Sequence, residues 1–272
     1  MKFEKQVRGS GPTLLLLHGV TRCGRDWQPL LPELARQWRV VALDQRGHGG
    51  SGRAASYLVK DYVADAVHFI REEVAVPVVI VGHSLGAMVA AAVAAELSLL
   101  VRAVVLEDPP FHTMGHRIPG TAWQAQFIGM QAAARRGGTI EQVTDALAGI
   151  SLPRPDGGTR LLGEMRDRAS LRWSAECLAL LDPEVLTPVI AGRWLDGYDA
   201  AGISARIRCP VLLLQADPQT GGALIDEDAQ LVLRSIAGCR HVSFLRTGHQ
   251  IHRDQPDAML QAVREFTATL AA

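Results

Sequence analysis

The stretch VVIVGHSLG, residues 78–86, joins a run of β-branched residues to a turn in which a serine lies between two glycines. The residues that follow, Ala87–Leu97, are rich in alanine and favour a helix. A strand, a tight turn and a helix in succession are the setting in which a G-x-S-x-G motif holds a nucleophile. Gly82 and Gly86 leave room for a strained backbone at the turn. The stretch therefore predicts that Ser84 is a nucleophile delivered by a buried strand.

Further apolar runs indicate that this strand belongs to a larger sheet. Strand patterns are expected at residues 13–17, 38–43, 101–106, 210–216 and 241–245, with helical patterns at 61–75 and 226–237 and a closing amphipathic helix from residue 256. Alternating strands and helices are typical of βαβ units. The expected fold class is therefore α/β, with a mostly parallel central sheet flanked by helices.

The middle of the chain has a different character. From residue 111 to about residue 207 no buried strand is expected, and helical patterns occupy 123–136, 139–149, 163–181 and 183–194. We therefore expect a core formed by residues 1–110 and 206–272, and a helical cap formed by residues 111–205.

Composition limits the partners of the chain. Lys and Arg together number 28 in the 272 residues, as do Asp and Glu, so no basic face for nucleic acid is expected. The four cysteines, Cys23, Cys177, Cys209 and Cys239, form no C-x-x-C pair, which argues against a zinc site or a disulfide framework and favours a cytoplasmic location. The early apolar run Leu14–Leu17 is too short to cross a membrane. A small molecule is the expected partner, no metal or cofactor is expected, and the oligomeric state stays open.

A serine hydroxyl becomes an effective nucleophile only when a base removes its proton. Among nine histidines, His249 is the best candidate, because it follows the last expected strand and Gly248 gives its backbone freedom. His252 is a weaker candidate. His83, inside the serine motif, is expected to line the pocket or to pack beside the turn.

Four motifs, considered together, resemble those of the α/β-hydrolase superfamily, in its cap-bearing esterase, lactonase and dehalogenase-like branch. They are His18-Gly19, the loop Asp44-x-Arg46-Gly47-x-Gly49-x-Ser51, Gly82–Gly86 and Gly248-His249. The resemblance covers nearly the whole chain and implies an α/β-hydrolase fold whose cap follows the sixth strand.

The resemblance also implies roles for individual residues. Ser84 would be the nucleophile and His249 the general base. The backbone N–H groups of Val20 and Leu85 would form the oxyanion hole, and each such donor is typically worth about 3 kcal/mol of barrier lowering. Epoxide hydrolase and haloalkane dehalogenase are disfavoured, because those relatives have an aspartate where this chain has Ser84.

The third member of the triad departs from the family pattern. Gln219 occupies the usual position of the acid, and an amide is a poor substitute for the carboxylate that fixes the imidazole tautomer. Asp108, after the strand at 101–106, and Asp217, two residues before Gln219, are the two alternatives. We place Asp108 first and keep Asp217 as the alternate acid. Glu107 should point to the opposite face of its strand.

The cap should cover the serine and shape an apolar pocket. The residues expected to line it are His83, Trp27, Trp123, Phe127, Met130, Trp173 and Trp194. The arginines of the insertion are interpreted as a solvated helix face, with a carboxylate clamp as the alternative; they are Arg135, Arg136, Arg166, Arg168 and Arg172.

The resulting hypothesis is a metal-independent serine hydrolase that cleaves a carboxylic ester or lactone through an acyl-enzyme. A carbon-carbon bond hydrolase or an acyltransferase could use the same triad. A non-catalytic ligand receptor on this fold is a further alternative, which the departure at Gln219 favours.

Overall fold

The computed structural model describes residues 1–154 and 156–270. Its main sheet has seven strands in the order β1-β3-β2-β4-β5-β8-β9, and all neighbours are parallel except β1 and β3. The α/β class predicted from the sequence is therefore confirmed. The strands are β1 (Lys5–Arg8), β2 (Thr13–Leu17), β3 (Arg39–Leu43), β4 (Val78–His83), β5 (Val101–Glu107), β8 (Val211–Ala216) and β9 (Arg240–Phe244).

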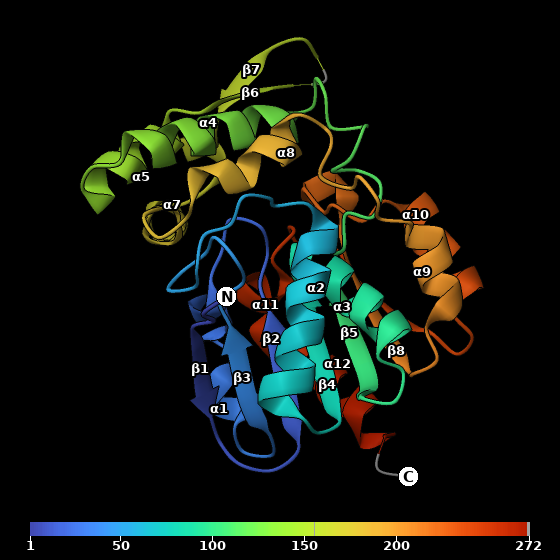
Figure 1. Ribbon diagram of the computed structural model, residues 1–272. Coiled ribbons are helices and arrows are strands. Elements are labelled where there is room, and N and C mark those ends of the chain that lie inside the picture. The colour runs from blue at the N-terminus through green and yellow to red at the C-terminus, as the bar shows by residue number, and fades with distance from the viewer. Residues whose placement is uncertain (155, 271–272) are drawn as a thin grey trace.

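Helices cover both faces of the sheet (Figure 1). Along β2, Leu15 and Leu17 pack into the cluster that contains α2 and α3, whereas Leu14 and Leu16 pack into the cluster that contains α1 and α12. This alternation explains why β2 is apolar throughout, since both of its faces are buried. The core helices are η1 (Gly24–Trp27), α1 (Leu31–Leu34), α2 (Val59–Phe69), η2 (Ile70–Val74), α3 (Leu85–Glu96), α9 (Ala200–Arg206), η4 (Pro218–Thr220), α10 (Asp226–Ser235), α11 (Ile251–Asp254) and α12 (Pro256–Ala268). Because α9 packs on α3 and α10, residues 200–205 belong with the core rather than with the cap in which they were expected.

The register of the parallel strands brings several loops to one edge of the sheet. Leu17 pairs with both Leu43 and Gly82, so β2, β3 and β4 end at nearly the same level. His83 pairs in turn with Glu107 on β5. The loops that follow β2, β4, β5, β8 and β9 therefore meet at the carboxyl edge, where α/β sheets bind ligands.

A helical cap lies over this edge (Figure 1). It follows β5, the fifth strand in chain order, where a sixth was expected, because residues 1–12 contribute only β1. The cap also contains a two-stranded sheet that the sequence patterns did not predict. Its elements are α4 (Ala122–Arg136), α5 (Ile140–Ala148), β6 (Ser151–Pro153), β7 (Thr159–Leu161), α6 (Leu162–Met165), α7 (Arg168–Leu178), η3 (Pro183–Leu186) and α8 (Thr187–Ile190).

The expected helix at 163–181 is broken into two. Arg166, with φ −127° and ψ 135°, is extended and ends α6. Asp167 then caps α7 by accepting a hydrogen bond from the Ser170 N–H at 2.8 Å. Because the N-cap residue must leave the helical conformation, this cap interrupts the helix beside Arg166.

The cap is held to the core by buried polar contacts. The Tyr57 hydroxyl donates to Asp182 Oδ2 at 2.7 Å, and the sulfur atoms of Cys23 and Cys177 are 3.9 Å apart. Across the described residues, every helix is too short or too polar to cross a membrane.

Candidate active site

The turn between β4 and α3 holds Ser84 in a strained conformation, with φ 53° and ψ −113°. Its N–H donates to the Glu107 carbonyl oxygen at 2.9 Å, which ties the turn to β5. A side chain on Gly82 would collide with the backbone of Gly86, and one on Gly86 would collide with the backbone of Leu17. Both glycines are therefore required by close backbone approach at this turn.

The loop after β2 packs directly on the serine turn. A Cβ atom added to Gly19 would lie 3.4 Å from the Ser84 Cβ atom and 2.8 Å from His83 Nδ1. Val20 is the next residue, and Leu85 is the first residue of α3, whose N–H has no acceptor within the helix. The two proposed oxyanion donors thus flank the serine.

Two buried histidines brace the loop that carries Val20. His48 Nε2 lies 2.6 Å from the Val20 carbonyl oxygen, and the Gln45 N–H donates to His18 Nε2 at 3.0 Å. Burial lowers the pKa of both His18 and His48 to about 4. These imidazoles are neutral at physiological pH and serve as fixed hydrogen-bonding groups.

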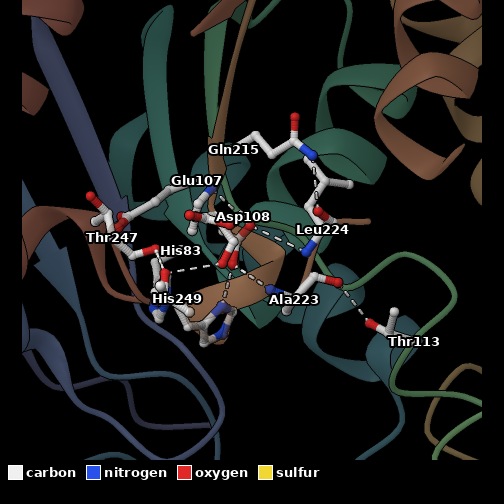
Figure 2. A network of polar contacts seen from close by, with 12 residues as sticks. His83, Glu107, Asp108, Thr113, Gln215, Ala223, Leu224, Thr247 and His249 are labelled. Carbon is white, nitrogen blue, oxygen red and sulfur yellow. Dashed lines mark hydrogen bonds and ion pairs between the residues drawn. The ribbon is translucent and has the colours of Figure 1, made fainter. Parts of the chain in front are cut away.

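His249 and Asp108 meet at the carboxyl edge of the sheet (Figure 2). His249 Nδ1 lies 2.6 Å from Asp108 Oδ2, and the carboxylate is completely buried. Three backbone N–H groups also donate to Asp108, those of Ala216 at 3.2 Å, Ala223 at 2.7 Å and Leu224 at 3.2 Å. The aspartate is thereby fixed in position before it receives the imidazole N–H.

Asp217, the alternate acid, contacts its own loop instead. Its Oδ1 accepts from the Gln219 N–H at 2.9 Å, and its Oδ2 accepts from the Arg246 N–H at 2.9 Å. Each of its oxygen atoms therefore braces the turn after β8, and the structure pairs His249 with Asp108.

A cavity lies beside Ser84 and His249, and part of it is open to solvent. Five of the residues expected to line it do so: His83, Trp123, Phe127, Met130 and Trp194. The Trp123 ring meets His249 edge to face at 5.3 Å between centroids. This wall is largely apolar, as the sequence predicted for the pocket.

Two of the expected aromatic residues lie outside this lining, which corrects the prediction. Trp27 is completely buried in the cluster beneath the sheet, where it packs 4.6 Å from His252. The Trp173 Nε1–H donates to Asp26 Oδ1 at 2.8 Å and so joins the cap to the core. Both side chains are engaged in packing or bracing rather than facing the cavity.

Six other lining residues were not predicted from the sequence: Gly19, Thr21, Arg22, Met114, Gln126 and Gln250. Arg166 also lines the cavity, and it is one of the cap arginines for which a carboxylate clamp was the alternative. Several of the six are sequence neighbours of predicted ones. Arg22 follows Val20 by two residues, and Gln250 follows His249 directly. Gln126 lies one helical turn from Trp123. Local spacing could have found these three.

His83 has a defined protonation state. Its Nε2 lies 2.8 Å from the His249 carbonyl oxygen, so Nε2 carries the proton that is donated. Burial, together with the charges of His249 and His252, holds the pKa of His83 well below its usual value. A neutral His83 thus fixes the backbone at His249 without adding a cation.

His252 lies in a separate buried ion network behind the cavity. Its Nδ1 is 2.8 Å from Glu107 Oε1 and its Nε2 is 3.0 Å from Asp26 Oδ2. Burial would lower the pKa of His252, but the two carboxylates outweigh it and raise the pKa to about 9. The imidazolium fixes α11, and with it the loop that begins at His249.

Asp26, His83 and His252 each place one potential ligand atom within 4.8 Å of the others. Three ligand atoms would be enough to coordinate a metal ion. A charged His252, however, has no free lone pair, since each of its nitrogen atoms carries a proton that faces a carboxylate. We therefore interpret this group as an ion network.

The charge on His252 makes stability depend on pH. Its folded pKa of about 9 lies above the ordinary value of 6.5, so its contribution is complete below pH 6.5 and is lost as the pH rises through 9. We expect the free energy of unfolding to fall by on the order of 3 kcal/mol across this window, measured by urea unfolding. In nuclear magnetic resonance spectra, the His252 imidazole signal is identified as the one that is absent from the His252→Gln variant. In the wild type this signal should titrate near pH 9. Titration at or below pH 6.5 would contradict the network.

Comparison with known proteins identifies the family. The alpha/beta hydrolase family model matches residues 14–262 of the chain. A segment of 102 residues is 39% identical to 2-(acetamidomethylene)succinate hydrolase from Mesorhizobium japonicum, covering 37% of this chain and only 37% of that relative. Pimeloyl-[acyl-carrier protein] methyl ester esterase from Stenotrophomonas maltophilia is 26% identical over 271 residues, 98% of this chain and 96% of that relative.

The fold is also shared with solved structures. The crystal structure of E-2-(acetamidomethylene)succinate hydrolase superposes with a TM-score of 0.74 at 24% sequence identity, covering 98% of this chain and 95% of that one. At this identity the likeness shows the fold alone. The family match over residues 14–262 confirms the resemblance seen in the motifs. The chain therefore belongs to the alpha/beta hydrolase family.

Proposed function

We propose that the protein is a serine hydrolase that cleaves a carboxylic ester or lactone of a small molecule through an acyl-enzyme. The observation that supports this most directly is the 2.6 Å contact of His249 Nδ1 with Asp108 Oδ2, beside a cavity that Ser84 and His249 both line. Such a set combines a nucleophile, a base and a group that orients the base.

The reaction follows from the protonation states. Because Nδ1–H donates to Asp108, the lone pair of His249 is on Nε2, where it can accept the Ser84 hydroxyl proton. Ser84 Oγ then attacks the carbonyl carbon of the substrate. The N–H groups of Val20 and Leu85 stabilise the resulting oxyanion.

Collapse of this intermediate forms the acyl-enzyme, whose hydrolysis then completes the cycle. The His249 imidazolium returns its proton to the leaving alcohol, and an ester remains on Ser84. A water molecule then transfers a proton to His249 and attacks the acyl carbon. Departure of Ser84 Oγ, reprotonated by His249, releases the carboxylic acid and restores the serine.

Ser84, His249 and Asp108 could also serve a different reaction, or a pocket that only binds its ligand. The relatives are named for hydrolysis of an acetamidomethylene succinate and of a methyl ester, so the family match leaves the bond type open. A carbon-carbon bond hydrolase or an acyltransferase is therefore the second candidate. A non-catalytic receptor is less favoured, because Asp108 supplies the carboxylate that Gln219 lacks.

We also propose a cytoplasmic location, since the four cysteines are present as thiols.

A fluorophosphonate probe tests the enzyme hypothesis. The probe should react with the purified protein at neutral pH and add its mass to the peptide that contains Ser84, because the neighbouring base makes the hydroxyl nucleophilic. Intact and peptide mass spectrometry measure the reaction, and heat-denatured protein serves as the control. Native protein that remains unlabelled would contradict the proposed function.

A further inference from the structure

Two arginines from different parts of the chain line the cavity that contains Ser84. Arg22 lies in the core loop, two residues after Val20. Arg166 lies in the cap, on the extended link between α6 and α7. The cavity is thus bordered by one arginine from the core and one from the cap.

Neither guanidinium is neutralised by a close acid. Arg22 is only 8% exposed, and its Nη1 donates to the Ser174 hydroxyl at 3.0 Å. Across residues 1–154 and 156–270, no carboxylate oxygen lies within 4.0 Å of Arg22 or Arg166. Since a guanidinium offers five N–H donors, both keep donors for a ligand.

The charge of Asp26 acts on Arg22, and the charges of Asp167 and Asp254 act on Arg166, each without an ion pair within 4.0 Å. The Asp26 carboxylate is bound by Trp173, His252 and Arg253. Asp167 uses its carboxylate to cap α7, and Asp254 acts on Arg166 only through its longer-range charge. A buried cation at Arg22 and a half-buried one at Arg166, without a contacting anion, are costly, and a bound anion would lower that cost.

Burial and the charge of Arg22 lower the pKa of Arg166, although Asp254 and Asp167 oppose the effect. Burial therefore disfavours the charge on Arg166, and the like charge of Arg22 adds to this. A carboxylate between the two would be attracted by both.

Other arginines of the cap show the contrasting arrangement. Arg168 is exposed and pairs with Glu141 at 2.6 Å and with Asp145 at 3.0 Å, and Arg172 also pairs with Glu141. These side chains form the solvated helix face expected from the sequence. Arg166 departs from it because the helix is interrupted at this residue.

We propose that Arg22 and Arg166 bind a carboxylate group of the substrate. The inference rests on the proposed hydrolase activity and narrows its substrates to esters or lactones that also carry a free carboxylate. A guanidinium fork matches the two oxygen atoms of a carboxylate. The apolar wall formed by Met114, Trp123 and Phe127 would contact the rest of the molecule.

A matched pair of substrates tests this site by activity. Mono-4-nitrophenyl glutarate carries a free carboxylate, and 4-nitrophenyl valerate replaces it with a methyl group. The wild type should prefer the glutarate ester, and Arg22→Gln or Arg166→Gln should reduce that preference in kcat/KM by about tenfold or more. Arg168→Gln is the control and should leave the preference unchanged. Equal losses for both esters in the two variants would overturn the proposal.

Binding to a protein that cannot turn over separates this site from the proposed reaction. In a Ser84→Ala background, calorimetry should show that glutarate binds, and that Arg22→Gln or Arg166→Gln weakens it by about tenfold or more. Glutarate affinity that is unchanged by both substitutions would overturn the carboxylate site, as would tighter binding of inorganic phosphate than of glutarate. Arginine-dependent glutarate binding in a protein that hydrolyses neither ester would support the site while contradicting the proposed function. Thermal unfolding verifies that each variant is folded. If Arg22→Gln does not fold, the results for Arg166→Gln alone decide whether the carboxylate site exists.

Discussion

Replacing Ser84 by alanine is expected to lower kcat for a 4-nitrophenyl ester by on the order of 10⁵- to 10⁶-fold. The reason is that alanine removes the attacking oxygen and leaves His249 with no hydroxyl to activate. The fold should persist, because alanine is smaller than serine and meets the same backbone requirement at φ 53°. Steady-state hydrolysis and thermal unfolding measure the two effects separately.

Ser243→Ala is a suitable control for this experiment. Ser243 is an exposed serine on β9, outside the residues that line the cavity. We expect it to keep wild-type activity, which would exclude a general effect of serine removal. If Ser84→Ala hydrolysed the ester at a rate close to wild type, the attacking group would have to be another side chain or a water molecule.

The strained turn at Ser84 could be predicted because it follows from a short motif and the strand before it. The spacing of Gly82, Ser84 and Gly86 reflects backbone contacts that are made within the turn and with β2. The pocket depends instead on how the cap packs on the core. Trp27 follows the loop after β2, yet it packs beneath the sheet because η1 directs it toward α1 and α12. The spacing of residues in the sequence does not tell whether Trp27 packs beneath the sheet or lines the cavity.

The side chains of Glu107 and Asp108, adjacent at the end of β5, point in different directions, as the alternation of side chains along a strand predicts. Glu107 binds His252, whereas Asp108, with φ 47°, turns toward His249. The choice between Asp108 and Asp217 required tertiary contacts, because both aspartates follow a strand at the same edge. What distinguishes Asp108 is the set of three backbone N–H groups from the last residue of β8 and the chain after it, 108 to 116 residues distant in sequence.

The arginines of the cap show a similar limit. A helical pattern at 163–181 suggested one solvated face, but the Asp167 cap interrupts that pattern. Arg166 therefore takes an extended conformation and lines the cavity, while Arg168 keeps its exposed ion pairs. The N-cap preference of aspartate is visible in the sequence, so the break could have been considered. The direction of the Arg166 side chain depends on the position of the cap over the sheet.

Replacing Asp108 by asparagine is expected to lower kcat by about 10⁴-fold, because an amide cannot hold His249 in the tautomer that leaves its Nε2 lone pair free. Stability should also fall. Oδ1 accepts from Ala216 and Leu224, and Oδ2 accepts from Ala223 and His249. With its NH₂ group toward His249, the asparagine loses the hydrogen bond from the Ala223 N–H and donates to His249 Nδ1, which then becomes an acceptor. The opposite orientation loses the hydrogen bonds from Ala216 and Leu224.

Asp217→Asn is the matched control for Asp108→Asn, since Asp217 also braces a loop through backbone N–H groups, those of Gln219 and Arg246. We expect this variant to lose some stability but to keep activity within about tenfold of wild type, because no histidine depends on it. Ester hydrolysis measured well below the unfolding temperature separates catalysis from folding, and nitrogen-15 resonances of His249 report its tautomer. If Asp217→Asn lost more activity than Asp108→Asn, the acid would be Asp217 and the cavity would have to rearrange before the reaction. The reverse ranking, with an altered His249 tautomer in Asp108→Asn alone, would assign the role of the acid to Asp108.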